Sequence, residues 1–473
     1  MKYFSSFCLD KCSNTPIYQQ IGNYFYYLIE TNQLQPHSKL PPIRSLANQL
    51  KVNTSTIVAT YKYLENKGIV YSKVGSGTYV MPLSLKYFEK LKEINLPSFS
   101  PTSLQSRESP LLNFASLTPP THLFPVQDFK RAINDVLDRD LGDAFSSEDP
   151  KGYVPLRETL CQWMQRTQIN TSVDQIQIIS GIKEGIAFLS QTLLQCGDFI
   201  FVETPTDPQI LAIFQSRGAK TVEIPMEKDG IDICFLETRL KAYRPKWVCL
   251  MPSYQNPTGV SYSIAKKRKI LELAVQYEFY LIELDLFCDL HYVGSRQLTL
   301  KALDKSDRVI YIKGFPSMPG LRLGFVSIPN LLCSTFFSTQ PRQGILASAL
   351  LQRSFERYLS LGLWEIQLEK ITTFYQLQYQ HSLQILEMHL REYIEYLPPG
   401  GGLGLWLQLK SSYPMETFYN TLLQKQVVVA PGSLFSLSQD HQYSFRFSFS
   451  IASPKEIDHG VKLILETMED LIK

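Results

Sequence analysis

The 473-residue sequence lacks the marks of several protein classes. It has no uninterrupted apolar run of the ~18 residues that a membrane helix needs, and its N-terminus does not resemble a signal peptide. The eight cysteines are scattered, and Cys8 and Cys12 are the one close pair, without a second pair to complete a zinc site. We therefore expect a cytoplasmic protein with reduced thiols, no metal centre and no membrane partner.

Charge is unevenly distributed along the chain. Residues 1 to 81 contain eight Lys or Arg and three Asp or Glu, a net charge of +5 within a total of +3. The chain is too long for one ordinary core, so two or more domains are expected. A small basic module joined to a large neutral one favours a polyanion partner for the module, although a chance bias of a solvated surface would look the same.

The first eighty residues predict three helices and a hairpin. Apolar residues recur at helical spacing in three stretches, Pro41 and Pro42 precede the second stretch, and Asn53 or Thr54 can cap the third. Two short apolar runs then flank a Gly-Ser-Gly tip, as in a β-hairpin. This order is typical of a winged helix-turn-helix, which we assign to residues 1–81.

The motif string is more specific than this topology. The runs at residues 40–47, 52–56, 61–69 and 75–80 resemble the GntR family of transcription regulators at almost every step. The resemblance implies a double-stranded DNA partner, with Arg44 as the base-reading arginine. Short polar side chains at the start of a recognition helix suit phosphates and base edges. The predicted DNA contacts are Arg44, Asn53, Thr54, Ser55, Thr56, Lys73, Gly75 and Gly77.

Two positions depart from the GntR pattern. Thr54 stands where relatives usually carry arginine, and Val58 stands where some members place a second arginine. We expect Thr54 to weaken DNA binding or to change its sequence preference. The alternative reading is that Arg44 is an ordinary surface residue and that the Ser/Thr run is only a helix cap.

Residues 82–110 predict a linker, because their second half is rich in Ser and Pro and lacks periodicity. From residue 111 onward, apolar runs alternate with helical stretches. This βα alternation predicts an α/β fold around a mostly parallel sheet, on which ligands bind beyond the carboxyl ends of the strands.

Landmarks of residues 111–473 resemble fold-type I aminotransferases, which use pyridoxal 5'-phosphate (PLP). They include Gly152–Arg157, Ile179–Gly181, Pro252–Gly259 and Pro319–Gly324. A helix-turn-helix fused to this fold resembles the MocR subgroup of GntR regulators. The resemblance implies a PLP-transferase-like domain, a small α+β C-terminal subdomain at about residues 340–473, and a homodimer.

The residues that hold PLP in the family are missing. Only Pro316, Ser317 and Met318 lie between Phe315 and Pro319, so the segment is shortened and Ser317 replaces the Schiff-base lysine. By the same resemblance, three further positions have changed: the pyridinium acid, the phenol and the ring tyrosine are Leu284, Phe287 and Asp207. We therefore predict no catalytic residue and no covalently bound PLP, although PLP is the family cofactor.

The surroundings of that site remain. The resemblance places Asn256 beside the ring oxygen, Arg322 at the phosphate and Arg446 at a substrate carboxylate. An arginine can hold a carboxylate or phosphate with two parallel hydrogen bonds, so these residues suggest a small anionic or amino-acid-like effector. A structural ion pair with a neighbouring acid is the other reading of Arg446.

Three classes of function remain open. The first is a DNA-binding regulator with an inactive aminotransferase-like domain. The second is a PLP-binding regulator or an active aminotransferase that uses a relocated lysine, for which Lys313 is the candidate. Asp285 could then serve as the acid, but successive strand residues face opposite sides, so it should point away from where position 284 points. The third is a purely structural protein, which the complete DNA-reading string opposes.

Overall fold

The computed structural model describes residues 16–30, 34, 38–66, 70–73, 77–80, 111–146, 149–294, 296–338, 347–437 and 441–472. The chain divides into two compact units, residues 1–98 and residues 99–473. The predicted linker, residues 82–110, and the predicted DNA contact Gly75 lie outside the described residues.

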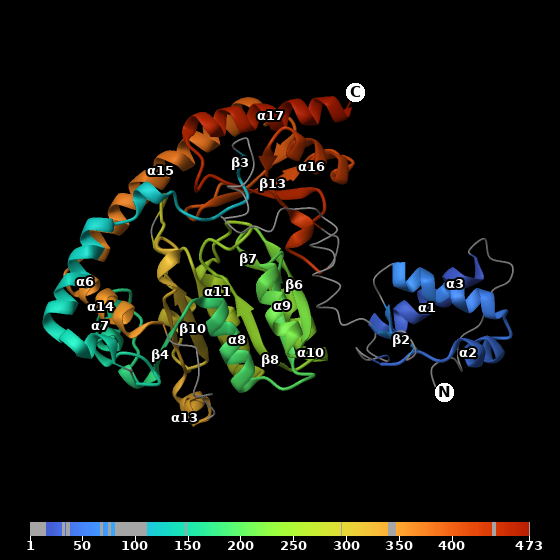
Figure 1. Cartoon of the computed structure of the whole chain (residues 1–473), viewed down its shortest axis with the longest axis horizontal. Coiled ribbons are helices and arrows are strands. Elements are labelled where there is room, and N and C mark those ends of the chain that lie inside the picture. Colours follow the sequence, from blue (N-terminus) through green and yellow to red (C-terminus); the bar gives the residue numbers. More distant parts are fainter. Residues whose placement is uncertain are drawn as a thin grey trace. The chain divides into compact units, whose positions relative to one another are not determined.

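The first unit has the predicted three helices and hairpin (Figure 1). Its core is formed by apolar residues from all three helices and the hairpin, among them Phe25, Leu46, Ile57 and Val80. Tyr61 donates a 2.6 Å hydrogen bond to the carbonyl of Pro41 and so ties the third helix to the start of the second. The elements are α1 (Ile17–Glu30), α2 (Ile43–Leu50), α3 (Thr54–Asn66), β1 (Val70–Lys73) and β2 (Gly77–Val80).

The second unit is built on an eight-stranded sheet of order β4-β11-β10-β9-β8-β5-β6-β7. The sheet is mostly parallel, as predicted, with β11 and the edge strand β7 antiparallel to their neighbours. Strands in the middle of the sheet, such as β8 and β10, are short runs that are mostly apolar, because helices cover both faces. The eight strands are β4 (Ile176–Ile179), β5 (Phe199–Thr204), β6 (Lys220–Glu227), β7 (Gly230–Ile231), β8 (Pro245–Leu250), β9 (Tyr280–Asp285), β10 (Val309–Gly314) and β11 (Gly324–Ser327).

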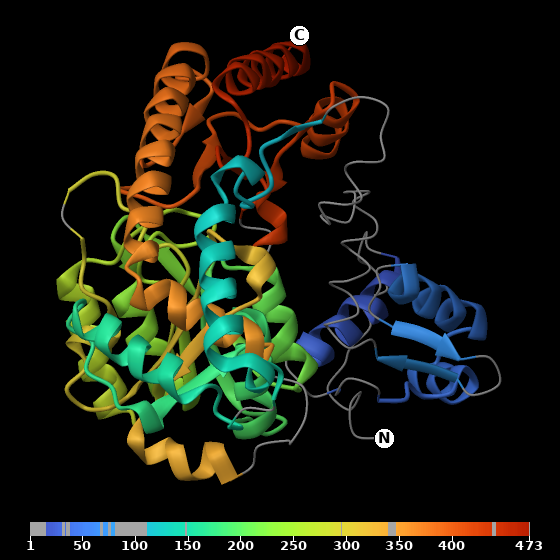
Figure 2. The same ribbon diagram turned by 60° about the vertical axis from the view of Figure 1, so that its left-hand side comes forward.

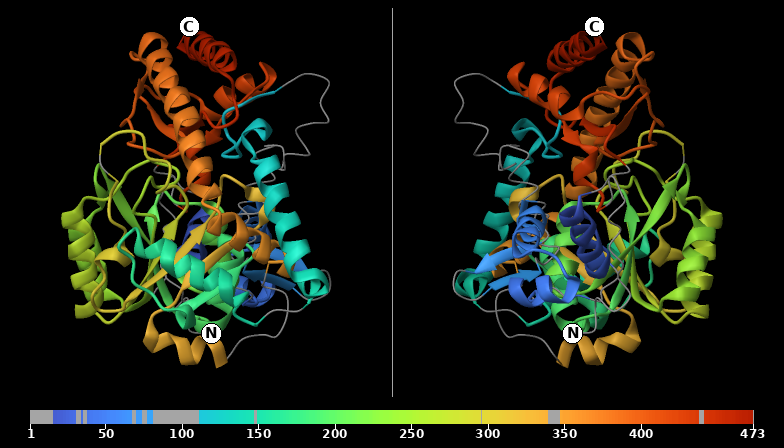
Figure 3. Two further views of the ribbon diagram at one scale, coloured as in Figure 1. Left: turned by 90° about the vertical axis from the view of Figure 1, so that its left-hand side faces the viewer. Right: turned by 90° about the vertical axis from the view of Figure 1, so that its right-hand side faces the viewer.

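Helices cover the two faces of this sheet in separate hydrophobic clusters. One face packs against α8 (Ile182–Leu193), α9 (Pro208–Ser216) and α13 (Asn330–Ser338). Figures 2 and 3 show α13 at the end of the sheet away from the C-terminal helix. The other face is covered by α6 (Val126–Asp140), α7 (Val154–Gln165), α10 (Ile233–Ala242), α11 (Ile264–Gln276), α12 (Leu300–Leu303) and α14 (Ala349–Ser360). None of the described helices has both the length and the apolar character to cross a membrane.

The small subdomain is α+β, as predicted, and its start at about residue 340 stays a prediction. Phe355 and Tyr358 of α14 lie in a core cluster with residues of α7 and β4, whereas Ile371 and Tyr375 of α15 enter the C-terminal core. The long helix α15 therefore joins the two parts. The subdomain contains α15 (Leu363–His389), α16 (Met415–Gln424), α17 (Pro454–Ile472) and the antiparallel strands β12 (Ile394–Glu395), β13 (Gly404–Leu409), β16 (Ser444–Ser448) and β15 (Ala430–Pro431), while β14 (Val427–Val428) pairs with β3 (Leu112–Asn113).

Candidate functional site

The start of α3 presents the predicted polar side chains to solvent. Asn53, Thr54 and Ser55 are exposed, Thr56 is half-buried, and Arg44 is exposed on the neighbouring helix α2. The opposite side of α3 faces the core, where the buried Thr60 donates a hydrogen bond of 3.3 Å to the carbonyl of Tyr18 in α1. The first turn of α3 therefore presents a polar surface to solvent, as a recognition helix requires.

The hairpin is joined by a third extended segment. The backbone N–H of Leu40 donates to the carbonyl of Thr78 at 2.8 Å, and the N–H of Val80 donates to Ser38 at 2.9 Å. Lys73 pairs in register with Gly77, which is exposed and has a φ of +123°. This conformation favours glycine. The hairpin is thus held against the segment just before α2, whereas the Lys73 side chain lies outside the described part.

At the second unit, the position of the family's lysine holds no amine. Ser317 lies between the end of β10 and the short 3-10 helix η5 (Pro319–Leu321). Its side chain is buried, and its Oγ has no hydrogen-bond partner among the described residues. The acid and phenol positions are buried in apolar clusters: Leu284 packs with Ile282 and Ile312, and Phe287 packs in the C-terminal core.

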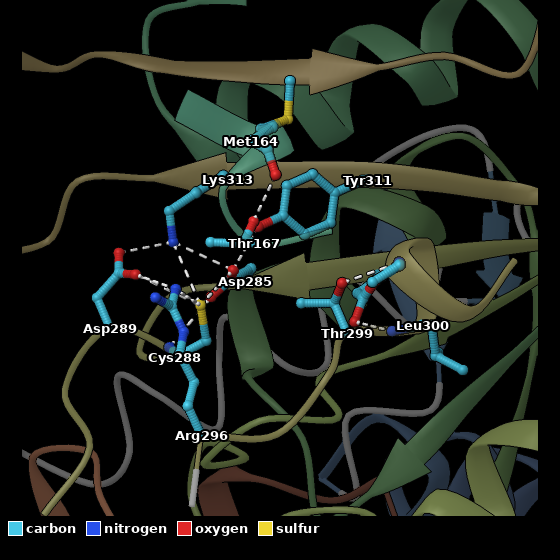
Figure 4. A network of polar contacts seen from close by, with 12 residues as sticks. Met164, Thr167, Asp285, Cys288, Asp289, Arg296, Thr299, Leu300, Tyr311 and Lys313 are labelled. Carbon is cyan, nitrogen blue, oxygen red and sulfur yellow. Dashed lines mark hydrogen bonds and ion pairs between the residues drawn. The ribbon is translucent and has the colours of Figure 1, made fainter. Parts of the chain in front are cut away.

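The neighbouring Asp285 faces the other side of β9, as strand alternation predicts, and there it meets Lys313 (Figure 4). The Lys313 Nζ lies 3.1 Å from Asp285 Oδ2 and 2.8 Å from Asp289 Oδ2. Asp285 also accepts hydrogen bonds from Tyr311 Oη at 2.5 Å and Cys288 Sγ at 2.7 Å. Arg296 donates to Asp289 at 2.7 Å, so two cations balance two carboxylates in this cluster.

The cations and carboxylates of this cluster stabilise one another in their charged forms. Burial lowers the pKa of the Lys313 ammonium, but Asp285 and Asp289 outweigh burial and hold the net pKa above the ordinary lysine value. Burial raises the pKa of the Asp285 carboxyl, yet Lys313 and the hydrogen bonds bring it below its ordinary value. An imine requires a neutral, accessible amine. Lys313 is charged and fully buried, so it does not meet this requirement.

Sequence reasoning missed this cluster. We had considered Lys313 and Asp285 as catalytic candidates, whereas the structure pairs them with each other. A lysine at the end of the apolar run Val309–Ile312 was the available signal, because a buried ammonium needs a counter-charge. Nothing in the sequence indicated that Asp289 and Arg296 would complete the group.

The predicted ligand residues Asn256 and Arg446 lie together. Arg446 Nη1 donates to Asn256 Oδ1 and Nη2 donates to the carbonyl of Ala115, both at 2.5 Å. Asn256 Nδ2 donates in turn to Asp207 Oδ2 at 3.3 Å. Burial lowers the pKa of Arg446 to about 10, and Asp207 opposes the shift, so the guanidinium stays charged at neutral pH.

Asp207 has a local role as well. It is the N-cap of α9, where its Oδ1 accepts the backbone N–H of Gln209 at 2.9 Å. The structure records no direct ion pair for Arg446 among the described residues; its carboxylate neighbour is reached through Asn256. The cavity beside Arg446, Asn256 and Phe287 measures about 10 Å³, which is room for about one water.

The third predicted ligand residue, Arg322, is exposed. Its Nη2 is 2.6 Å from Glu184 Oε1 in the first turn of α8. A Cβ added to Gly181, the N-cap of α8, would lie 2.6 Å from Glu184 Oε2, so this carboxylate folds back over the start of its own helix. A carboxylate there interacts favourably with the helix dipole. Glu184 thus pairs with the arginine that the family resemblance assigns to a phosphate.

These residues do not fit PLP. The lysine position holds Ser317, the acid position holds the buried Leu284, and Glu184 already neutralises Arg322. A cavity of about 10 Å³ is far below the few hundred Å³ of a small-molecule pocket. No PLP-dependent step is therefore assigned to these residues.

The buried carboxyl of Glu203, near the end of β5, should make the stability of the second unit depend on pH. Burial raises the pKa of its carboxyl to about 7 from 4.5, against hydrogen bonds from Tyr262, the Met251 N–H and Gln255. The folded state holds the proton more tightly than the unfolded chain. The resulting stabilisation is full below pH 4.5 and is lost as the pH rises through about 7.

Glu203→Gln should remove this pH dependence. Between pH 5 and pH 8 the unfolding free energy of the variant should rise by about 2.5 kcal/mol relative to that of the unsubstituted protein. Urea unfolding followed by tryptophan fluorescence reports on this unit alone, because all four tryptophans lie in it. Burial also raises the pKa of Glu283 to about 7, but Glu283 is present in both proteins and cancels. The same pH profile in both proteins would contradict the assignment.

The chain joins a winged helix-turn-helix unit to a unit with the aminotransferase fold. This combination defines a class of transcription regulators. Residues 109–464 match the family of aminotransferase class I and II, and residues 17–80 match the bacterial regulatory proteins of the gntR family. The chain therefore belongs to the aminotransferase class I and II family, and it is a regulator of the GntR type and MocR subgroup.

Similar proteins include both transcription regulators and aminotransferases. The uncharacterized HTH-type transcriptional regulator YdfD of Bacillus subtilis is 26% identical, over 95% of this chain and 96% of its own length. MocR of Rhizobium meliloti, a probable rhizopine catabolism regulatory protein, is 22% identical over 96% of this chain and 94% of its own. The crystal structure of a multiple substrate aminotransferase from Thermococcus profundus superposes with a TM-score of 0.74 and 26% identity, covering 81% of this chain and 95% of that one.

Proposed function

We propose that this regulator binds operator DNA through Arg44 and the start of α3, and that its aminotransferase-like unit forms no imine with PLP. One observation carries the second part. The lysine nearest in sequence to the family's lysine position, Lys313, is fully buried between the carboxylates of Asp285 and Asp289. A DNA partner also accounts for the basic first 81 residues and favours the cytoplasm as the location of the protein.

The remaining role of the large unit is to dimerise and to sense a ligand. A homodimer would present two DNA-reading units to spaced half-sites. Arg446 is the best-supported contact for a small anionic effector, because its buried Nε has no partner among the described residues. An effector larger than a water needs residues that line the cavity beside Arg446 to move. The effector would act by favouring one arrangement of the dimer.

Incubation of the full-length protein with PLP tests the proposal. We expect no imine absorbance band and, after borohydride reduction, no stoichiometric label on any lysine. A PLP-dependent aminotransferase treated in the same way is the positive control. Mapping the labelled peptide identifies the lysine if a label does form.

A stoichiometric label on Lys313 would establish the relocated Schiff base, and with it a PLP-binding regulator or an active aminotransferase. A stoichiometric label on any other lysine would equally overturn the proposal. DNA binding is measured on the same samples by selection from a random duplex library, so loss of the cofactor proposal and loss of the DNA-binding proposal are distinguishable.

A further inference from the structure

One apolar side chain interrupts the polar surface of the recognition helix. Val58 of α3 is 41% exposed, and it is the one large apolar residue exposed within the described part of residues 16–80. The core-facing apolar residues of the same helix, Ile57, Tyr61 and Leu64, are at most 6% exposed. Val58 is therefore not needed to pack α3 against its own unit.

Val58 lies on the face that the DNA-contacting residues occupy. Thr54, Val58 and Lys62 follow one another at intervals of four residues, so they share one side of the helix, and all three are exposed. With a rise of about 1.5 Å per residue, Val58 lies about 6 Å beyond Thr54 along the helix axis. It therefore sits one turn into the helix, at the end that enters the major groove.

The chemistry of the major groove offers one apolar partner. Base edges there present hydrogen-bond donors and acceptors, except for the C5-methyl group of thymine. A valine can neither donate nor accept a hydrogen bond, so against any other edge it would desolvate polar atoms without replacing their bonds. Against a thymine methyl, both partners lose apolar surface to water.

We propose that Val58 is a specificity-determining residue that selects a thymine in each operator half-site. The inference rests on the proposed DNA binding and deepens it. Neither Thr54 nor Val58 can make the two parallel hydrogen bonds by which arginine reads guanine. The side chains in the first two turns of α3 therefore read the half-site through their methyl and hydroxyl groups.

The test removes the methyl group from the DNA. Duplexes are first selected by the full-length protein from a random library, and each conserved thymine is then replaced in turn by deoxyuridine. Loss of one methyl contact should weaken binding by about fourfold per substituted half-site. The same scan with Val58→Ala should show no loss at that thymine, because the contact is already gone. Alanine is a better helix former than valine, so the variant should keep the helix.

Two further variants separate base reading from general affinity. Lys62→Ala, on the same face, should weaken binding to all duplexes about equally and leave the deoxyuridine effect intact. Selection repeated with Val58→Arg should replace the thymine by guanine. An equal deoxyuridine effect in the unsubstituted protein and in Val58→Ala, or no effect in either, would overturn the inference while the DNA-binding proposal stands. Failure to enrich any duplex would overturn both.

Discussion

Replacing Arg44 by alanine is expected to lower operator affinity by about 10- to 100-fold, the equivalent of about 1–3 kcal/mol. The residue is exposed on α2, and the core of its unit is formed by residues such as Leu46 and Ala47. The substitution should therefore leave the fold intact. Fluorescence anisotropy with a labelled operator duplex measures the loss, and circular dichroism checks the helices.

The pattern of the loss tells which contact Arg44 makes. If it reads a base edge, binding to the operator weakens more than binding to unrelated DNA, and specificity falls at one position. If it contacts only a phosphate, affinity falls about equally for all sequences and the salt slope drops by about one. The matched control is Arg391→Ala, since Arg391 is 75% exposed at the end of α15, in the other unit. Unchanged operator affinity in Arg44→Ala would argue against the assigned reading surface.

The fold was largely predictable because its signals are local. Short apolar runs such as Ile176–Ile179 and Val309–Ile312 are strands of the sheet, and the helical stretches between them are helices. In the winged helix-turn-helix unit, the apolar residues that recur at helical spacing, such as Ile21, Phe25 and Ile57, are fully buried. The start of the small subdomain is not a local signal, because α14 has the same periodicity whichever core it joins.

For the candidate ligand site, the sequence predicts which residues are missing but not how the remaining ones are paired. The absence of a lysine between Phe315 and Pro319 is visible in the sequence. The partners of the remaining charges are not, because they come from distant segments: Arg322 pairs with Glu184, 138 residues earlier, and Lys313 pairs with Asp285 across two strands. Pairwise contacts of this kind follow from the register of the sheet, which no local pattern specifies.

Removing the charge of Lys313 is expected to have the largest effect on stability. Lys313→Met keeps most of the side-chain volume but leaves the buried Asp285 without its cation, and Asp289 with Arg296 alone. Removing one partner of a buried ion pair typically costs about 3–5 kcal/mol, because an uncompensated charge stays behind. We expect a loss of this size for the second unit. Urea unfolding followed by tryptophan fluorescence measures it, since all four tryptophans lie in that unit.

Two comparison variants show whether charge is the cause. Lys269→Met removes a lysine that is 44% exposed and paired with Glu237, and should leave the unfolding free energy nearly unchanged. The double variant Lys313→Met/Asp285→Asn removes both charges, so it should be less destabilised than the sum of the two single variants, by about 0.5–3 kcal/mol. If Lys313 instead served to bind PLP, its loss would change the unfolding free energy little in the absence of PLP. Added PLP would then stabilise only the unsubstituted protein. Near-native stability of Lys313→Met without PLP would therefore contradict a structural role for this ammonium.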